Sequence, residues 1–96
     1  MSLLRWPNKD PDERLDYALL WDSEMVARND EIIQSHWFIV DDDGTLQIVS
    51  DGVDGHSTYV WLEGGIAGKS YTLTNRIHTA GTRIYDRSVM LLCVEK

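Results

Sequence analysis

Hydrophobic and polar positions alternate along several short stretches of the chain. In residues 15–21, "LDYALLW", every second side chain from Leu15 onward is a large apolar one, which is the two-residue period of a half-buried strand. Residues 31–40, "EIIQSHWFIV", are rich in β-branched and aromatic types and predict a second strand. Between these strands, residues 23–30 predict one helical turn with Ser23 as its N-cap.

Two clusters of aspartate and glycine divide the middle of the chain. "DDDG" at residues 41–44 and "DGVDGHS" at residues 51–57 have the composition of turns, because Asp and Gly tolerate turn dihedral angles at little cost. They bound two short predicted strands, "TLQIVS" at 45–50 and "TYVWLE" at 58–63. Short strands separated by such frequent turn signals are typical of a sandwich or small barrel.

The last third of the chain fits one hairpin register. If Gly81 is the apex of the turn, Leu73 faces Val89 and joins apolar to apolar. On the other face of the hairpin, the same register sets Arg76 opposite Asp86. The sequence therefore predicts this pair within salt-bridge reach, where an exposed pair contributes about 0.2–1 kcal/mol.

These elements predict one all-β domain, an immunoglobulin-like or fibronectin-III-like β-sandwich of about seven strands, over residues 15–96. Residues 1–14 contain both prolines and mixed charge, which predicts an extended arm without regular structure. Such an arm packs along its own domain or lies on a neighbour, and Trp6 is the candidate contact residue within it. Three tryptophans at strand parity are expected in the core: Trp21, Trp37 and Trp61.

The stretch "GGIAGKS" at residues 64–70 raises the question of phosphate binding. A phosphate-binding loop of the G-x-x-x-x-G-K-[ST] type needs glycine where Glu63 stands, and it must lead into a helix. The residues that follow, "SYTLTNRI", are strand-like instead, so the sequence does not predict a nucleotide-binding loop. In a sandwich, a tyrosine near the start of the penultimate strand folds back onto the upstream backbone; Leu62, Gly68 and Tyr71 are placed for such a tyrosine corner.

Charge bears on the class of partner. The chain has 96 residues, with 16 acidic and 9 basic side chains and a net charge of −7, which argues against nucleic acid as a partner. Residues 1–54 carry 13 acids and 4 bases, whereas residues 55–96 carry 3 acids and 5 bases. This polarity either orients subunits or reflects a solvated acidic face. No apolar run approaches the ~20 residues that span a bilayer, so no membrane partner is expected.

No constellation of residues predicts catalysis or a cofactor. Cys93, the single cysteine, lies among strand residues without a nucleophile motif, and it forms no disulfide framework. A calcium site on the loops at Asp41–Asp43 and Asp51–Asp54 is an open alternative, although the EF-hand spacing is absent. The histidines have neither zinc-ligand spacing nor companion cysteines: His36, His56 and His78.

The chain resembles a family of small bacteriophage and prophage proteins described as fibre-tail adaptor proteins. The resemblance covers residues 11–94 and is carried by "LDYALLWDSEM", "ARNDEIIQSHWFI", "GTLQIVS" and "WLEGGIAGKSYTLTNRIHTAGTRIYDRSVMLLCV". Its most specific positions are the acidic "LDY" start, Trp21, Asp30 to Trp37, Trp61, Gly64, Gly65, Gly68, Tyr71, Thr74, Asn75, Arg76, Gly81, Arg83, Asp86 and Arg87. The sequence departs from the family pattern in the acidic "DDDG" turn and at His78, where threonine is expected.

The resemblance implies a non-enzymatic structural subunit of the virion, at the tail or its fibre connection, assembled in the bacterial cytoplasm. Its implied partners are other phage tail or fibre proteins and further copies of itself. The arm around Trp6 and the sheet edges are the expected contact surfaces. An alternative is a carbohydrate- or host-surface-binding sandwich, which would present Trp6, Tyr59 or Tyr85 as an exposed flat ring. A module that mimics acidic nucleic acid is suggested by the net charge alone.

Overall fold

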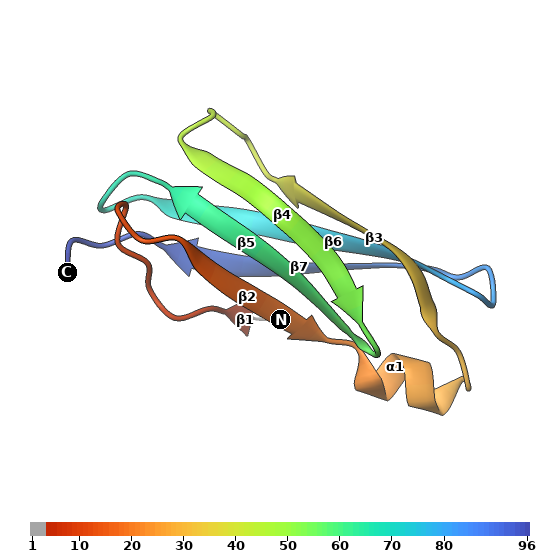
Figure 1. The fold of residues 1–96 in the computed structure, drawn as a ribbon. Helices are drawn as coiled ribbons and strands as arrows, with labels where there is room; N and C mark the ends of the chain where they lie inside the picture. The colour runs from red at the N-terminus through yellow and green to blue at the C-terminus, as the bar shows by residue number, and fades with distance from the viewer. Residues whose placement is uncertain (1–3) are drawn as a thin grey trace.

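A computed structural model describes residues 4–96, which form two packed β-sheets and one short helix (Figure 1). The elements are β1 (Leu4–Arg5), β2 (Leu15–Leu20), α1 (Asp22–Ala27), β3 (Ile32–Ile39), β4 (Leu46–Asp54), β5 (Ser57–Gly64), β6 (Ser70–Thr79) and β7 (Ile84–Leu92).

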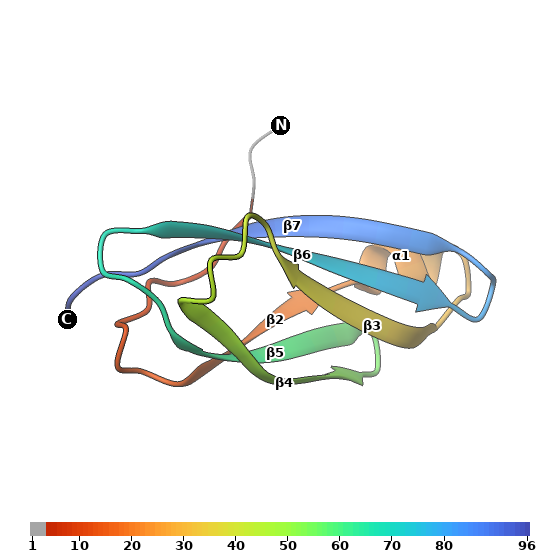
Figure 2. The same ribbon diagram turned by 90° about the horizontal axis from the view of Figure 1, so that it is seen from above.

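The strands form a four-stranded sheet in the order β1-β7-β6-β3 and a three-stranded sheet in the order β2-β5-β4. Figure 2 shows the sheets as two layers, with α1 at one end. The prediction of an all-β sandwich is confirmed. The groupings β7-β6-β3 and β2-β5-β4 are those of constant-type immunoglobulin domains if β1 is lettered A; the immunoglobulin-like assignment itself stays a prediction.

The core lies between the two sheets and follows the alternation in the sequence. β6 is the clearest case, because its odd-numbered residues from Tyr71 to Thr79 are buried and its even-numbered residues face outward. β2 buries Tyr17 and Leu19 in the same way. The buried apolar residues form one cluster: Tyr17, Leu19, Trp21, Met25, Ile32, Trp37, Leu46, Val60, Leu62, Tyr71, Leu73, Ile77, Val89, Leu91 and Cys93.

The β6–β7 hairpin has the register that the sequence predicts, with Leu73 opposite Val89. At its tip the left-handed backbone is at Thr82, with φ of 65°, one residue after the expected apex. Gly81 itself leaves room for two neighbouring side chains. A Cβ at this position would overlap the carboxylate of Asp30 and the guanidinium of Arg83, so the ends of these side chains would have to shift.

Two local predictions are wrong. The loop expected at residues 51–57 shrinks to a turn at Gly55 and His56, because β4 stays paired with β5 as far as Asp54 opposite Ser57. The helix begins at Asp22, so Ser23 is not its N-cap; Trp21 holds that position without a side-chain cap.

Trp61 is not a core residue, contrary to expectation. On β5 the inward positions belong to the even-numbered residues such as Val60 and Leu62, both fully buried, whereas Trp61 is 37% exposed. Because side chains alternate between the faces of a strand, Trp61 and Tyr59 point away from the core. Trp21 and Trp37 are buried as predicted, at 1% and 8% exposure.

The N-terminal segment contains regular structure that was not predicted. β1 runs parallel to β7, with Leu4 opposite Val89. Farther along, the backbone N–H of Lys9 donates to the carbonyl of Leu92 at 3.1 Å. Residues 4–9 thus follow the last strand of their own domain, which is one of the two courses expected for the arm.

Candidate partner-binding surfaces

A buried asparagine links the two sheets at the centre of the sandwich. The Oδ1 atom of Asn75 accepts hydrogen bonds from Trp21 Nε1 at 3.0 Å and from the Thr58 hydroxyl at 2.7 Å. Its Nδ2 atom donates to Ser35 Oγ at 2.9 Å and to the carbonyl of His36 at 3.0 Å. All the hydrogen-bonding capacity of this amide is used, which makes Asn75 a rigid link between β6, β3, β5 and the start of α1.

Tyr71 folds back onto the glycine loop that precedes it. Its hydroxyl accepts a hydrogen bond from the backbone N–H of Ile66 at 2.9 Å and lies 2.7 Å from Thr45 Oγ1. Gly64, Gly65 and Gly68 all have positive φ, a conformation that glycine adopts without steric cost. The loop therefore turns tightly enough to bring its backbone within hydrogen-bond reach of the Tyr71 hydroxyl.

Leu62 and Gly68 do not contact the Tyr71 hydroxyl through hydrogen bonds. Leu62 is fully buried in the core, and Gly68 donates its N–H to the carbonyl of Cys93 at 2.8 Å. The other partner, Thr45 in the turn just before β4, has no recognisable signal in the sequence, because the contact arises from the packing of one sheet on the other.

Trp6 packs against its own domain. Its ring stacks on Tyr17 with centroids 4.6 Å apart and lies 5.5 Å from the ring of Trp37. Its Nε1 atom donates to the carbonyl of Ala18 at 3.2 Å. The ring thereby links the segment that follows β1 to β2 and packs against the core, while part of it stays exposed to solvent.

Lys9 is a fully buried lysine, and its burial was not predicted from the sequence. Its Nζ atom donates to the carbonyls of Asp10 at 2.9 Å and Gly64 at 2.7 Å. Burial lowers the pKa of the Lys9 ammonium below its ordinary value. The side chain fastens the N-terminal segment to the end of β5, so this segment is part of the folded unit.

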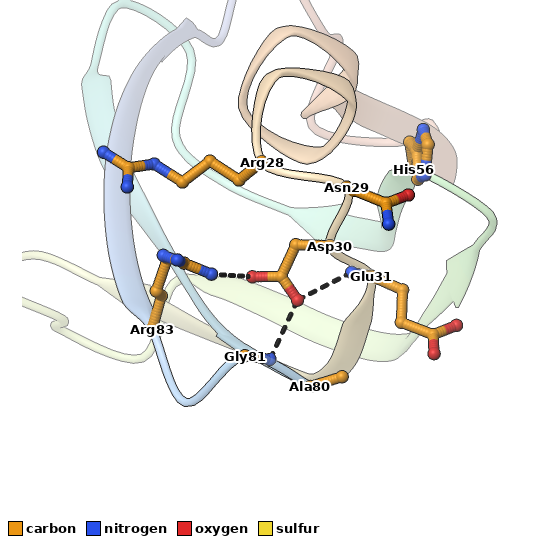
Figure 3. A pocket seen from close by; sticks show the side chains of 8 residues that line it. All are labelled: Arg28, Asn29, Asp30, Glu31, His56, Ala80, Gly81 and Arg83. Atoms are coloured by element: carbon orange, nitrogen blue, oxygen red, sulfur yellow. Dashed lines mark hydrogen bonds and ion pairs between the residues drawn. The ribbon is translucent and has the colours of Figure 1, made fainter.

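An open depression lies at the α1 end of the sandwich (Figure 3). Asp30 accepts a hydrogen bond from the Gly81 N–H at 2.9 Å and pairs with the Arg83 guanidinium at 2.9 Å. Hydrogen bonds from the Thr79 side chain and from backbone N–H groups, with that from Arg83, hold the pKa of the Asp30 carboxyl well below its usual range. This carboxylate holds the hairpin tip against the start of β3. The depression is lined by Arg28, Asn29, Asp30, Glu31, His56, Ala80, Gly81 and Arg83.

The outer face of the β2-β5-β4 sheet carries two aromatic side chains of β5. Trp61 stands between Asp16 of β2 and Ser50 of β4. Tyr59 leans across Gly52 of β4, whose missing side chain leaves room for the ring, since a Cβ there would overlap the phenol. An exposed tryptophan beside a tyrosine is the composition typical of protein-interface centres.

Arg76 and Asp86 lie on the opposite side of the molecule, on the outer face of the β1-β7-β6-β3 sheet. Arg76 Nε donates to Asp86 Oδ1 at 2.8 Å, and a second guanidinium nitrogen donates to Oδ2 at 3.0 Å. The guanidinium also lies 5.5 Å from the ring centroid of Phe38. Both members of the ion pair are about half exposed.

Metal-site geometry is absent from the residues that the structure describes, because no three His, Cys, Asp or Glu side chains converge. Asp42 and Asp43 instead accept the N–H groups of Gly44 and Thr45, at 2.8 and 3.0 Å, and Asp43 pairs with Lys69. Within residues 4–96, no helix has the length and apolar character needed to cross a bilayer.

A family model matches residues 9–92, and its description is Podophage GP4 fiber-tail adaptor protein gp77. No curated protein sequence matches the chain. The family match begins at buried Lys9 and ends with β7. It thus covers the glycine loop, the Asn75 network and both aromatic side chains of the β2-β5-β4 face. Because the match spans most of the chain, this protein belongs to the podophage GP4 fiber-tail adaptor family.

Proposed function

We propose that the protein is a non-enzymatic structural adaptor of the phage virion that docks on tail and fibre proteins through its sheet surfaces. The family assignment supports the adaptor role. Buried polar side chains make the interior rigid, because the hydrogen bonds of Asn75 and Lys9 join separate elements of the fold. A rigid domain of this kind holds two partner proteins at a fixed distance and orientation, and this role needs no catalytic site.

The observation that carries this proposal is the outward-facing Trp61 on the central strand of the β2-β5-β4 sheet. Tryptophan and tyrosine contribute most to binding energy when they lie near the centre of a contact. Trp61 is 37% exposed, with half-buried Tyr59 two residues away on the same face. Leu20, 69% exposed, lies at the end of β2 on this face.

The N-terminal segment contributes a second contact in this proposal. Leu4 is 49% exposed, and β1 is the outermost strand of its sheet, so one side of its backbone is available for pairing. Trp6 acts here through its stack on Tyr17, which fixes the position of β1.

The test is binding of the purified chain to the tail and fibre proteins of the same phage, measured by biolayer interferometry. Trp61→Ala should weaken binding at least about 30-fold, the effect of a hot-spot residue worth about 2 kcal/mol or more. Ile66→Ala is the matched control, since Ile66 is 48% exposed but lies in the glycine loop. Equal affinities of the two variants would show that Trp61 lies outside the binding interface.

Carbohydrate binding is a second candidate, favoured by the tyrosine ring that lies across Gly52 on an open sheet face. It predicts that neutral oligosaccharides shift the fluorescence of Trp61 and protect it from quenching. Binding to sugars but not to the tail and fibre proteins would replace the adaptor proposal with this one.

A further inference from the structure

The depression at the α1 end of the sandwich has the size of a small-ligand site and a polar lining. Its volume is about 710 Å³, within the range of about 300–1,000 Å³ that is usual for such sites. A second hollow of about 280 Å³ shares Arg28 with it. Charged and amide side chains make up most of the lining of the larger depression, whereas the centre of a protein interface is mostly apolar. The depression is therefore suited to a small polar ligand.

Arg28 is an arginine without a carboxylate partner in a chain that is rich in acids. The chain has 16 acidic and 9 basic side chains, and six of the nine basic ones form ion pairs with carboxylates. Lys9 is buried against backbone carbonyls instead. Within residues 4–96 this leaves Arg5 and Arg28, which are both exposed. The Arg28 guanidinium therefore keeps its N–H donors for a ligand.

Arg83 adds a second guanidinium on the same side of the depression as Arg28 (Figure 3). Its Nη1 atom donates to Asp30 at 2.9 Å, which fixes the side chain and leaves its other N–H groups for a ligand. The Asp30 carboxylate also accepts the N–H groups of Glu31 and Gly81, both at 2.9 Å. The side chain of Asp30 is only 3% exposed. Because its own partners neutralise this carboxylate, it does not prevent an anion from binding at the two arginines.

The opposite side of the depression carries an amide, an imidazole and a carboxylate. Figure 3 shows Asn29, His56 and Glu31 on the side away from the two guanidinium groups. The Nδ1 atom of His56 lies 2.9 Å from Asp22 Oδ1, which leaves Nε2 for a ligand. The Asn29 amide makes no hydrogen bond to the other residues drawn in Figure 3. Groups that donate and accept in this way suit the hydroxyl groups of a ligand.

We propose that the depression binds a sugar that carries one carboxylate. The carboxylate lies on Arg28 and Arg83, because a guanidinium matches a planar carboxylate with two parallel hydrogen bonds. The hydroxyl groups face the opposite side, where Glu31 would repel a second carboxylate. Beyond Arg28, Tyr85 lines the second hollow, and its ring gives an aromatic surface for a neighbouring sugar unit. An acidic side chain of a partner protein would use the guanidinium side alone. This proposal does not depend on the adaptor role, which uses the Trp61 side of the molecule.

The test titrates the full chain, labelled for amide NMR, with pairs of ligands that differ at the carboxylate. Cellobiouronic acid, a glucuronic acid joined to glucose, is compared with cellobiose, and sialyllactose is compared with its methyl ester. Each acid should bind at least about tenfold more tightly than its neutral counterpart. The amide signals of Arg28, Asn29 and Gly81 should shift, whereas the indole signal of Trp61 should not. Equal binding of acid and neutral ligand, or no shift with either acid at millimolar concentration, would overturn the proposal.

Matched variants locate the site. Arg28→Gln should weaken binding of the acids at least about tenfold, because it removes a charge-assisted contact. Arg5→Gln is the control, since it removes the same charge from an exposed arginine on β1 and should leave the affinity unchanged. Ala80→Glu adds a carboxylate at an exposed position of the lining and should abolish binding.

An acidic peptide tests the other source of a carboxylate. Acetyl-Gly-Glu-Gly-amide is titrated in the same way, beside its glutamine counterpart. The proposal predicts that this peptide binds at least about tenfold more weakly than the acidic sugars, because it has no hydroxyl groups for the side opposite the two arginines. Binding of the peptide but of neither acidic sugar, or equal affinities of Arg28→Gln and the wild type, would overturn the proposal.

Discussion

Replacing Asn75 by alanine should be among the most damaging single changes in the molecule. The substitution removes the acceptor of Trp21 Nε1 and of the Thr58 hydroxyl, both buried. A buried donor without a partner costs about 1–3 kcal/mol, so the two together cost about 2–6 kcal/mol. This loss is large beside the about 5–15 kcal/mol by which domains of this kind are stable.

The assay is urea denaturation followed by far-UV circular dichroism, which reports mainly on the backbone of the strands. Thr74→Ala is the matched control on the adjacent, outward position, where only a hydroxyl contact to Ser88 at 2.8 Å is lost. Its expected cost is about 0.5–1.5 kcal/mol. If Asn75→Ala destabilised the protein no more than this control, the proposed role of the amide as the central link would be refuted.

A double-mutant cycle refines the same prediction. Thr58→Val alone removes a hydrogen bond and should destabilise the protein. In the Asn75→Ala background it removes a stranded hydroxyl instead, so its cost should vanish or reverse. The expected coupling is about 0.5–3 kcal/mol. Additive effects would show that Thr58 finds another partner when Asn75 is absent.

Three further changes test the remaining contacts. Tyr71→Phe should lower the free energy of unfolding by about 1–3 kcal/mol, because the Ile66 N–H loses its acceptor; an unchanged urea midpoint would contradict this. Trp6→Ala should cost about 1–3 kcal/mol, less than the about 3–5 kcal/mol of a fully buried Trp, and a cost below that of an ordinary surface change would show that the stack on Tyr17 is not stabilising. The depressed pKa of Asp30 stabilises the fold above the ordinary carboxyl pKa of 3.8 and ceases to do so as pH falls through the lower folded value. The wild type should therefore lose more stability than Asp30→Asn between about pH 4 and 2, and parallel pH profiles would exclude this role.

The strands could be predicted where the alternation of apolar and polar residues allowed only one strand register. The β6–β7 hairpin has one register that joins apolar to apolar, and the structure has Leu73 opposite Val89. β4 was cut short in the prediction because "DGVD" has turn composition, and only its pairing with β5 keeps it extended. Trp61 was misplaced because size and apolar character suggested the core, although parity with Leu62 already placed it on the other face.

The interior polar contacts were harder to predict. Asn75 stands at an inward position of β6, which was a usable signal for a buried amide, but its partners come from strands distant in sequence. Lys9 gave no such signal, because a lysine between prolines and aspartates resembles a solvated arm. Its burial follows from the return of the N-terminal segment along β7, a tertiary contact that no local pattern encodes.

The adaptor role is tested most directly by asking whether the chain bridges its partners. Purified tail and fibre proteins of the same phage are mixed with and without the chain, and the complexes are measured by size-exclusion chromatography with light scattering. The account predicts that tail and fibre proteins co-elute when the wild-type chain is present and separate when it is omitted or replaced by Trp61→Ala. Tail and fibre proteins that associate equally well without the chain, or that leave it unbound, would contradict the account.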